Sequence, residues 1–238
     1  MSKQRHISRL AAPRSWQVAR KATKWISKPL PGPRTKVEGI PLVVLLRDVT
    51  GIIENKRELK YLINTKQIMV NGKLYKETNL AVGLFDVISF PSIKKSYRVV
   101  LTKLGKLQMV EISEKEANTL LLQVNEKTSV KGGKLQINLS NGWNLLTDTK
   151  TKVKVGESVL FDLKKRKISE NFGFNKGATV YFVRGKRAGH SAVFKSLKES
   201  GILQRQKIAV LEFGKETIES TLNNLITVGS KKASITIN

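Results

Sequence analysis

Positive charge constrains this chain more than any other feature of its sequence. The 238 residues include 44 Lys and Arg but only 18 Asp and Glu, a formal net charge of +26 at pH 7. Self-repulsion of this size opposes a compact fold unless a polyanion neutralises it, and nucleic acid is the commonest polyanion. Hydrophobic residues still make up 40% of the chain, which is enough for a buried core. We therefore expect a folded protein that binds nucleic acid.

Membrane and enzyme classes fit this sequence poorly. The longest apolar run lies roughly between Ile40 and Leu46, far short of the ~20 residues that a spanning helix needs. The chain contains no cysteine, which excludes disulfides, thiolate zinc sites and cysteine nucleophiles. Phosphate-loop, dinucleotide and zinc-protease motifs are absent from the sequence. We expect no catalytic residue, metal, cofactor, small-molecule substrate or membrane partner.

Residues 1–40 form a basic tail that contains a single acid, Glu38. Its prolines favour an extended path from Pro29 to Pro33, with at most a short helix between Pro13 and Pro29. Such a segment cannot form a core alone, so we expect it to order mainly on its partner. Two tryptophans lie among the cations, and each can either stack on an unpaired base or anchor the tail to the folded body. The candidate RNA-binding residues of the tail are Arg5, His6, Arg9, Trp16, Arg20, Lys21 and Trp25.

Residues 41–95 are predicted to form two helices and a hairpin. The first helix is the apolar segment Leu42–Val49, and Asn55 is a candidate N-cap for a second helix that ends near Asn64. In the second helix, one face is apolar at the i, i+3, i+4 spacing and another is basic. The apolar face consists of Leu59, Leu62 and Ile63, and the basic face of Lys56, Arg57 and Lys60. A basic helix face is either solvated or an RNA contact, and a basic hairpin beside it favours RNA.

The hairpin is predicted from Asn71-Gly72, a strong type I′ turn signal because both turn positions need a positive φ. We expect a strand over Lys66–Val70, a return strand at Lys73–Tyr75 and a further strand over Val82–Phe90. The basic residues of the second helix and of this hairpin should fall on the same side.

Residues 96–172 are expected to form a central β-rich domain. Strand patterns occur at Tyr97–Leu101, Leu135–Leu139 and Val159–Leu163. Ser113 and Glu116 have the spacing of a capping box, which predicts a helix through Val124. Gly132-Gly133-Lys134 is more typical of a turn than of a phosphate site, so structural roles dominate here.

Residues 173–238 begin with a strand over Gly177–Val183, followed by a basic glycine loop and a strand at Ala192–Phe194. Glycines allow the backbone to approach a ligand closely, and the cations supply charge for phosphates. The candidate RNA contacts of the loop are Arg184, Lys186, Arg187, Gly189 and His190. His190 can instead be a packed turn residue. Later alternating runs such as Ile208–Phe213 are expected to complete a small barrel.

Three separated features resemble the S4e family of small-subunit ribosomal proteins, of archaeal and eukaryotic type. The first is the tail His6–Pro13 with Trp16, Lys21, Trp25 and Gly32-Pro33. The second resembles the S4-type RNA-binding domain and covers Arg47-Asp48-Val49, Lys66–Lys73 and Val82–Ile88. The third resembles a KOW motif, with Gly177, Val180, Gly185, Gly189 and Val193. The chain departs from the family pattern at Ala192, where KOW motifs usually carry glycine, and at Arg34, where histidine is expected.

The resemblance implies an α+β, mostly β protein built from several modules. These are a basic N-terminal extension (1–40), an S4-type αα-hairpin domain (41–95), a central β-rich domain (96–172) and a C-terminal KOW or SH3-like small barrel (173–238). It implies a structural constituent of the small ribosomal subunit in the cytoplasm, with ribosomal RNA and neighbouring ribosomal proteins as partners. It also implies that the RNA-binding face of the S4-type domain consists of Arg57, Lys60, Lys66, Asn71 and Lys73. The alternative is an RNA-processing or transcription factor that uses its KOW domain to bind protein. An RNA-modifying enzyme would need a separate catalytic domain that residues 96–238 do not resemble.

Overall fold

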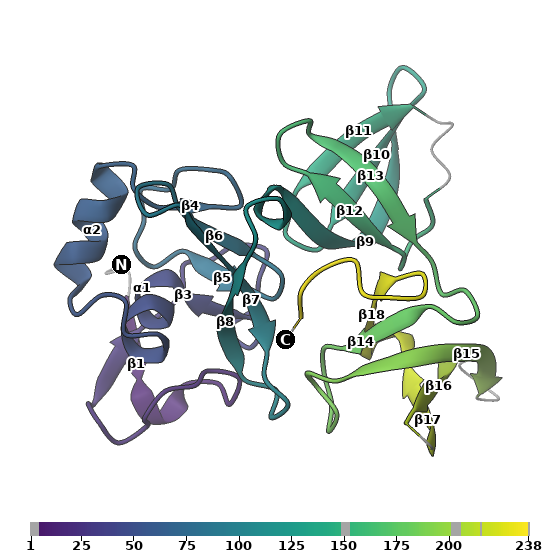
Figure 1. The fold of residues 1–238 in the computed structure, drawn as a ribbon, viewed down its shortest axis with the longest axis horizontal. Coiled ribbons are helices and arrows are strands. Elements are labelled where there is room, and N and C mark those ends of the chain that lie inside the picture. The colour runs from purple at the N-terminus through teal and green to yellow at the C-terminus, as the bar shows by residue number, and fades with distance from the viewer. Residues whose placement is uncertain (1–4, 149–152, 201–205, 215, 238) are drawn as a thin grey trace. The chain divides into compact units, whose positions relative to one another are not determined.

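The computed structural model describes residues 5–148, 153–200, 206–214 and 216–237, so the first four tail residues lie outside the described part. The chain is mostly β, as predicted, and it divides into two compact units (Figure 1). Unit 1 runs to Thr102 and includes Lys106–Leu120, whereas unit 2 comprises Lys103–Gly105 and Leu121–Ile237. In the described residues, no helix is long and apolar enough to cross a membrane.

Unit 1 contains small antiparallel sheets and the longest described helix. Strand β1 (His6–Ser8) pairs with β2 (Trp25–Ser27), and β3 (Gly39–Pro41) pairs with β5 (Ala81–Gly83). A larger sheet has the order β4-β6-β7-β8, with bounds Met69–Val70, Val87–Phe90, Lys95–Leu101 and Leu107–Ile112. A single 3-10 turn, η1 (Arg9–Ala11), follows β1.

The two predicted helices of unit 1 are confirmed. Helix α1 (Leu42–Val44) continues into a π-helical turn, η2 (Leu45–Val49), and the side chains from Leu42 to Leu46 are buried. Helix α2 (Lys56–Asn64) begins after Asn55 and buries Leu59 and Ile63. Asn55 occupies the N-cap position, but its side chain makes no capping hydrogen bond.

Two predicted elements of unit 1 are wrong because side-chain contacts override the local pattern. The expected strand Val82–Phe90 is interrupted by a turn in which Phe85 has φ 63°, and the Gly83 amide donates to Asp86 Oδ2 at 2.7 Å. The capping box gives only a 3-10 turn, η3 (Glu116–Asn118), before the chain enters strand β9 (Thr119–Val130). The Glu116 carboxylate lies 2.8 Å from the fully buried Arg98 guanidinium, which fixes the chain in this turn.

Unit 2 contains two five-stranded sheets. The first has the order β11-β10-β9-β12-β13, and β10 to β13 span Lys134–Leu139, Asn144–Asp148, Ser158–Asp162 and Lys167–Phe172. The second has the order β17-β16-β15-β14-β18, and β14 to β18 span Thr179–Phe182, Ser191–Ser200, Gln206–Phe213, Glu216–Thr221 and Leu225–Gly229. A 3-10 turn, η4 (Leu222–Asn224), precedes β18. The second sheet encloses a core that includes Val180, Phe194 and Leu211.

The tail folds onto unit 1, so the expectation that it orders mainly on a partner is wrong. Ile26 and Trp16 are 1% and 2% exposed, and the Leu107 amide donates to the Ser15 carbonyl at 2.7 Å. Between Pro13 and Pro29 the chain forms strand β2 and no helix. These buried side chains supply the core contacts that a basic segment lacks on its own.

Candidate nucleic-acid interface

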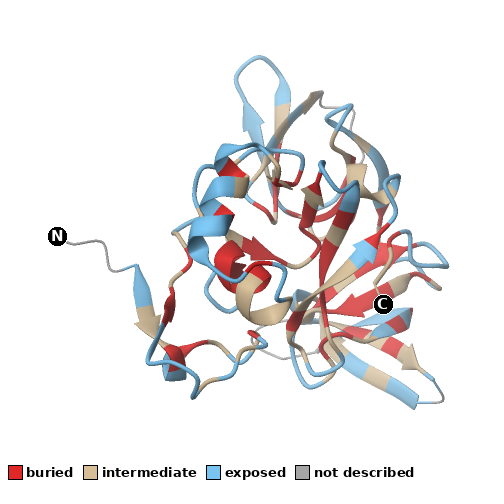
Figure 2. Cartoon of the chain, turned by 60° about the vertical axis from the view of Figure 1, so that its left-hand side comes forward, coloured by how far each residue is buried: buried red, intermediate tan, exposed pale blue. Residues whose placement is uncertain are grey.

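Helix α2 presents its basic residues to solvent, as the sequence predicts. Lys56, Arg57 and Lys60 are exposed, whereas Leu59 and Ile63 are buried on another face of the helix. Figure 2 shows the same division along the helix, with exposed outer turns and a buried inner face. The three cations are therefore available to a polyanion at no cost in core packing.

Lys66 ends this helix in a strained backbone conformation. The Gln67 amide donates to the Leu62 carbonyl at 2.9 Å and the Lys66 amide to the Ile63 carbonyl at 3.1 Å, the two bonds of a Schellman motif. The motif requires a left-handed residue, and Lys66 has φ 59°. Glycine is the usual residue here because other side chains pay a steric cost. The predicted strand Lys66–Val70 is consequently reduced to Met69–Val70.

The hairpin turn Asn71-Gly72 forms as predicted, with φ of 50° and 69°, but Asn71 is not a surface contact. Its side chain is buried, donates from Nδ2 to Asp86 Oδ1 at 2.9 Å and accepts the Val87 amide at 2.8 Å. The Arg34 guanidinium lies 2.6 Å from the same Asp86 oxygen. Asn71 and Arg34 thus hold the buried Asp86 carboxylate. Of the two RNA contacts predicted in this hairpin, Asn71 and Lys73, only Lys73 is exposed.

The predicted tail contacts separate into buried and exposed groups. Trp16 donates from Nε1 to the Gly39 carbonyl at 3.1 Å and is 2% exposed, so it anchors the tail and is not available to stack on a base. Arg9 is also buried, and its Nη2 lies 3.3 Å from Asp48. Arg20 is half-buried and donates to the Leu10 carbonyl at 3.0 Å. The exposed members of the set are Arg5, His6, Lys21 and Trp25.

The basic glycine loop lies between β14 and β15, as predicted, but its residues are not equally available. Arg184 and Lys186 are exposed, whereas Gly189 is buried. The Arg187 guanidinium carbon lies 5.7 Å from the Phe213 ring centroid. The His190 ring packs edge to face on the same Phe213 ring, with 5.5 Å between the two centroids. Arg187 and His190 therefore pack on β16, which leaves the tip of the loop as its accessible basic part.

A basic turn that the analysis of the sequence did not select connects β12 to β13. Lys164, Lys165, Arg166 and Lys167 are all exposed there. Asp162 Oδ1 accepts the Lys164 and Lys165 amides at 2.8 and 3.1 Å, which holds the turn in one geometry. These backbone hydrogen bonds keep the pKa of Asp162 below its ordinary value, and the bond from the Lys165 amide has the largest effect. The run of four consecutive cations was the signal in the sequence.

Comparisons with known proteins decide the family. Residues 93–168 match the model of ribosomal family S4e, and residues 1–36 match the RS4NT (NUC023) domain. The small ribosomal subunit protein eS4 of Nanoarchaeum equitans is 39% identical over 225 residues, which cover 94% of this chain and 95% of the relative. This chain belongs to the ribosomal S4e family.

Further relatives agree with this assignment. The small ribosomal subunit protein eS4 of Methanocella arvoryzae is 36% identical and covers 81% of each chain. The crystal structure of the 30S ribosomal protein S4e from Thermoplasma acidophilum matches with a TM-score of 0.68 at 25% identity, and the match covers 83% of this chain and 98% of that one. The family that the sequence resembles is thus confirmed, and it is a family of ribosomal proteins, not of enzymes.

Proposed function

We propose that this chain is a structural constituent of the small ribosomal subunit in the cytoplasm, where it binds ribosomal RNA and neighbouring ribosomal proteins. Its relatives are named as small-subunit proteins. The observation that carries the proposal is the basic surface of α2, where Lys56, Arg57 and Lys60 project from a helix whose other face is buried. Lys66, which has a left-handed backbone conformation, and the exposed Lys73 add to the cations of the same segment.

The proposed modules follow the expected division of the chain. Residues 41–95 would act as an S4-type RNA-binding domain, with α2 and the Asn71-Gly72 hairpin as its RNA face. Residues 173–238 would act as a KOW-type barrel whose loop tip, Arg184 to Lys186, contacts RNA or a protein neighbour. The tail 1–40 and the central domain 96–172 would supply further phosphate contacts, including the basic turn from Lys164 to Lys167.

The proposed mechanism is electrostatic docking refined by RNA shape, without chemistry. Each phosphate that a Lys or Arg neutralises releases condensed counterions, so affinity falls with salt. Because the cations are carried on folded elements, they recognise one spatial arrangement of phosphates rather than any flexible strand. Binding then lowers the free energy of that RNA arrangement during assembly and in the finished subunit.

The proposal is tested by the affinity of the full-length protein for a small-subunit rRNA transcript across a range of salt concentrations, with bulk tRNA as competitor. If about ten phosphates are contacted, the slope of log affinity against log salt should be about −7 to −9. The variant with Lys56, Arg57 and Lys60 all replaced by Ala should reduce that slope by about 3.

The matched control removes cations that are already neutralised within the protein. The ammonium group of Lys195 lies 3.5 Å from the Glu212 carboxylate, and that of Lys198 lies 2.7 Å from the Glu219 carboxylate. Replacement of both lysines by Ala should therefore change the salt slope less, per cation removed, than the α2 variant does. Equal affinity for rRNA and tRNA, or a salt slope that the α2 variant leaves unchanged, would contradict the proposal.

A further inference from the structure

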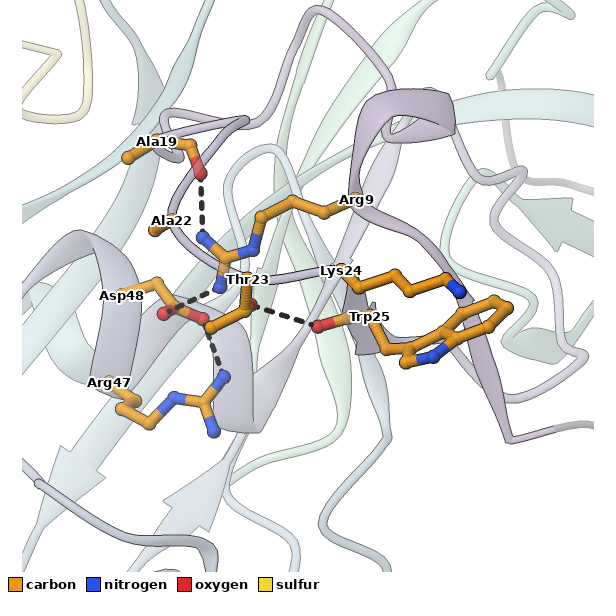
Figure 3. A pocket seen from close by; sticks show the side chains of 8 residues that line it. All are labelled: Arg9, Ala19, Ala22, Thr23, Lys24, Trp25, Arg47 and Asp48. Atoms are coloured by element: carbon orange, nitrogen blue, oxygen red, sulfur yellow. Dashed lines mark hydrogen bonds and ion pairs between the residues drawn. The ribbon is translucent and has the colours of Figure 1, made fainter.

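A hollow lies beside the tail of unit 1. It has a volume of about 560 Å³, which lies in the ~300–1,000 Å³ range of ligand pockets. Figure 3 shows how the tail and the end of η2 surround it. The lining residues are Arg9, Ala19, Ala22, Thr23, Lys24, Trp25, Arg47 and Asp48.

Trp25 gives the hollow an accessible aromatic face. It is 57% exposed, in contrast to the buried Trp16 of the same tail. Its backbone is fixed by pairing with Ser8 in β1, and its carbonyl accepts a hydrogen bond from Thr23 Oγ1 at 3.2 Å. The Lys24 ammonium lies 5.6 Å from the ring centroid (Figure 3). A solvent-exposed indole on a fixed backbone, beside a cation, is the combination that stacks a base while holding its phosphate.

The floor of the hollow is positively charged. Asp48 is shared between two arginines, with Oδ1 3.3 Å from Arg9 Nη2 and Oδ2 2.9 Å from Arg47 Nη2. Arg9 also donates from Nη1 to the Ala19 carbonyl at 2.7 Å, but its enclosed Nε has no acceptor among the described residues. One carboxylate therefore faces two guanidinium groups, and the Arg47 side chain is still 32% exposed.

We propose that this hollow receives a single unpaired nucleotide of the ribosomal RNA, with its base on the Trp25 ring and its phosphate against Lys24 and Arg47. The inference rests on the proposed function and names the form of RNA that this site takes. A base inside an A-form duplex does not offer its face, so the nucleotide must come from a loop, bulge or strand end. The excess of cations favours a nucleotide over an apolar side chain of a protein neighbour.

The first test measures the affinity of the full-length protein for a small-subunit rRNA transcript. Trp25→Ala should weaken binding by about 5- to 150-fold, the loss expected for one base–aromatic stack. Trp25→Phe should lose less because it keeps a ring, and Lys24→Gln should make the salt slope less steep by about 1. The control is Val37→Ala, which truncates an apolar side chain of similar exposure, 64%, away from the hollow. Urea midpoints should change far less than for Trp16→Ala, since Trp25 is 57% exposed and Trp16 only 2%.

The second test follows Trp25 fluorescence in a Trp143→Phe background, with Trp25→Phe in the same background as the baseline for Trp16. Addition of the transcript should quench the Trp25 signal, whereas a blunt RNA duplex should leave it unchanged. Wild-type rRNA affinity with no effect of Trp25→Ala and no quenching would overturn the inference while the proposed function stands. If the Trp25→Ala protein binds RNA with unchanged affinity but is missing from assembled subunits, the inference is also overturned, and the hollow binds a protein neighbour instead. Failure of the wild-type protein to prefer rRNA would instead defeat the proposed function.

Discussion

Replacement of Lys66 by Gly should stabilise unit 1 and weaken RNA binding at the same time. Lys66 occupies the left-handed position of the Schellman motif that ends α2, with φ 59°. A non-glycine residue pays about 1–2 kcal/mol in this conformation, and glycine loses about 0.5–1 kcal/mol of extra backbone entropy on folding. The free energy of unfolding should therefore rise by about 0.5–1 kcal/mol. Loss of one cation that contacts phosphate should make the salt slope of rRNA binding less steep by about 1.

The assay needs a signal from unit 1 alone, because a chain with two compact units need not unfold in one step. Trp16 and Trp25 lie in unit 1 and Trp143 in unit 2, so a Trp143→Phe background confines tryptophan fluorescence to unit 1. At an m-value of about 2 kcal/mol/M, the urea midpoint should rise by about 0.3–0.5 M.

Lys66→Ala is the matched control, because it removes the charge but keeps the strain. It should weaken RNA binding as much as Lys66→Gly does, with little change in the urea midpoint. If Lys66→Gly leaves RNA affinity intact, the strained lysine has no RNA contact and the argument for this position fails. If Lys66→Gly lowers the midpoint, the assignment of strain is refuted instead.

Three further predictions follow from the buried and turn residues. Asn71→Gly still allows the positive φ of the turn but removes two buried hydrogen bonds, so the free energy of unfolding of unit 1 in urea should fall by about 2–4 kcal/mol. The surface variant Lys76→Ala should change that free energy by no more than about 0.5 kcal/mol. Trp16→Ala should lower the free energy of unfolding by about 3–5 kcal/mol in the same assay, and a decrease below about 1 kcal/mol would show that Trp16 does not anchor the tail. The pKa of Asp162 is lowered, so its hydrogen bonds to the turn amides are fully present above pH 3.8, the ordinary pKa of an aspartate, and should be lost only at lower pH. An NMR pH titration in which the Lys165 amide shifts with a midpoint above 3.8 would contradict this.

Local patterns predicted the elements whose cause is local. Asn71-Gly72 forms the positive-φ turn that its residue types require. The apolar spacing of Leu59 and Ile63 correctly gave the buried face of α2, and alternation gave β10 (Lys134–Leu139). These features depend on neighbours within a few residues, so a single sequence contains most of the information.

The wrong predictions involve partners that are distant in sequence. Ser113 and Glu116 have capping-box spacing, and the Glu116 amide does lie 3.4 Å from Ser113 Oγ. The Glu116 side chain, however, contacts Arg98, 18 residues earlier, and the following leucines enter a sheet. Asp86 similarly interrupts a strand-like apolar run because Arg34 and Asn71 converge on it. Only the tertiary fold determines these contacts.

The same limit applies to the candidate interface. Residue type selected Trp16, Asn71 and Arg9 as RNA contacts, but burial assigns them to the protein interior. Trp16 and Trp25 were equivalent in sequence, and the structure separates an anchor from an exposed aromatic ring. The basic faces of α2 and of the loop tip after β14 could be predicted because charge runs at helix and loop positions remain exposed in most folds.

Crosslinking of the tagged protein to RNA in its own cells, followed by sequencing of the bound RNA and sedimentation of the lysate, tests the proposed ribosomal role. Reads should concentrate on a few discrete segments of small-subunit rRNA, and the protein should sediment with that subunit. Replacement of Lys56, Arg57 and Lys60 by Ala should reduce the reads at one of these segments. Reads spread over tRNAs or nascent messages, or sedimentation free of ribosomes, would contradict the account and favour a processing or transcription factor.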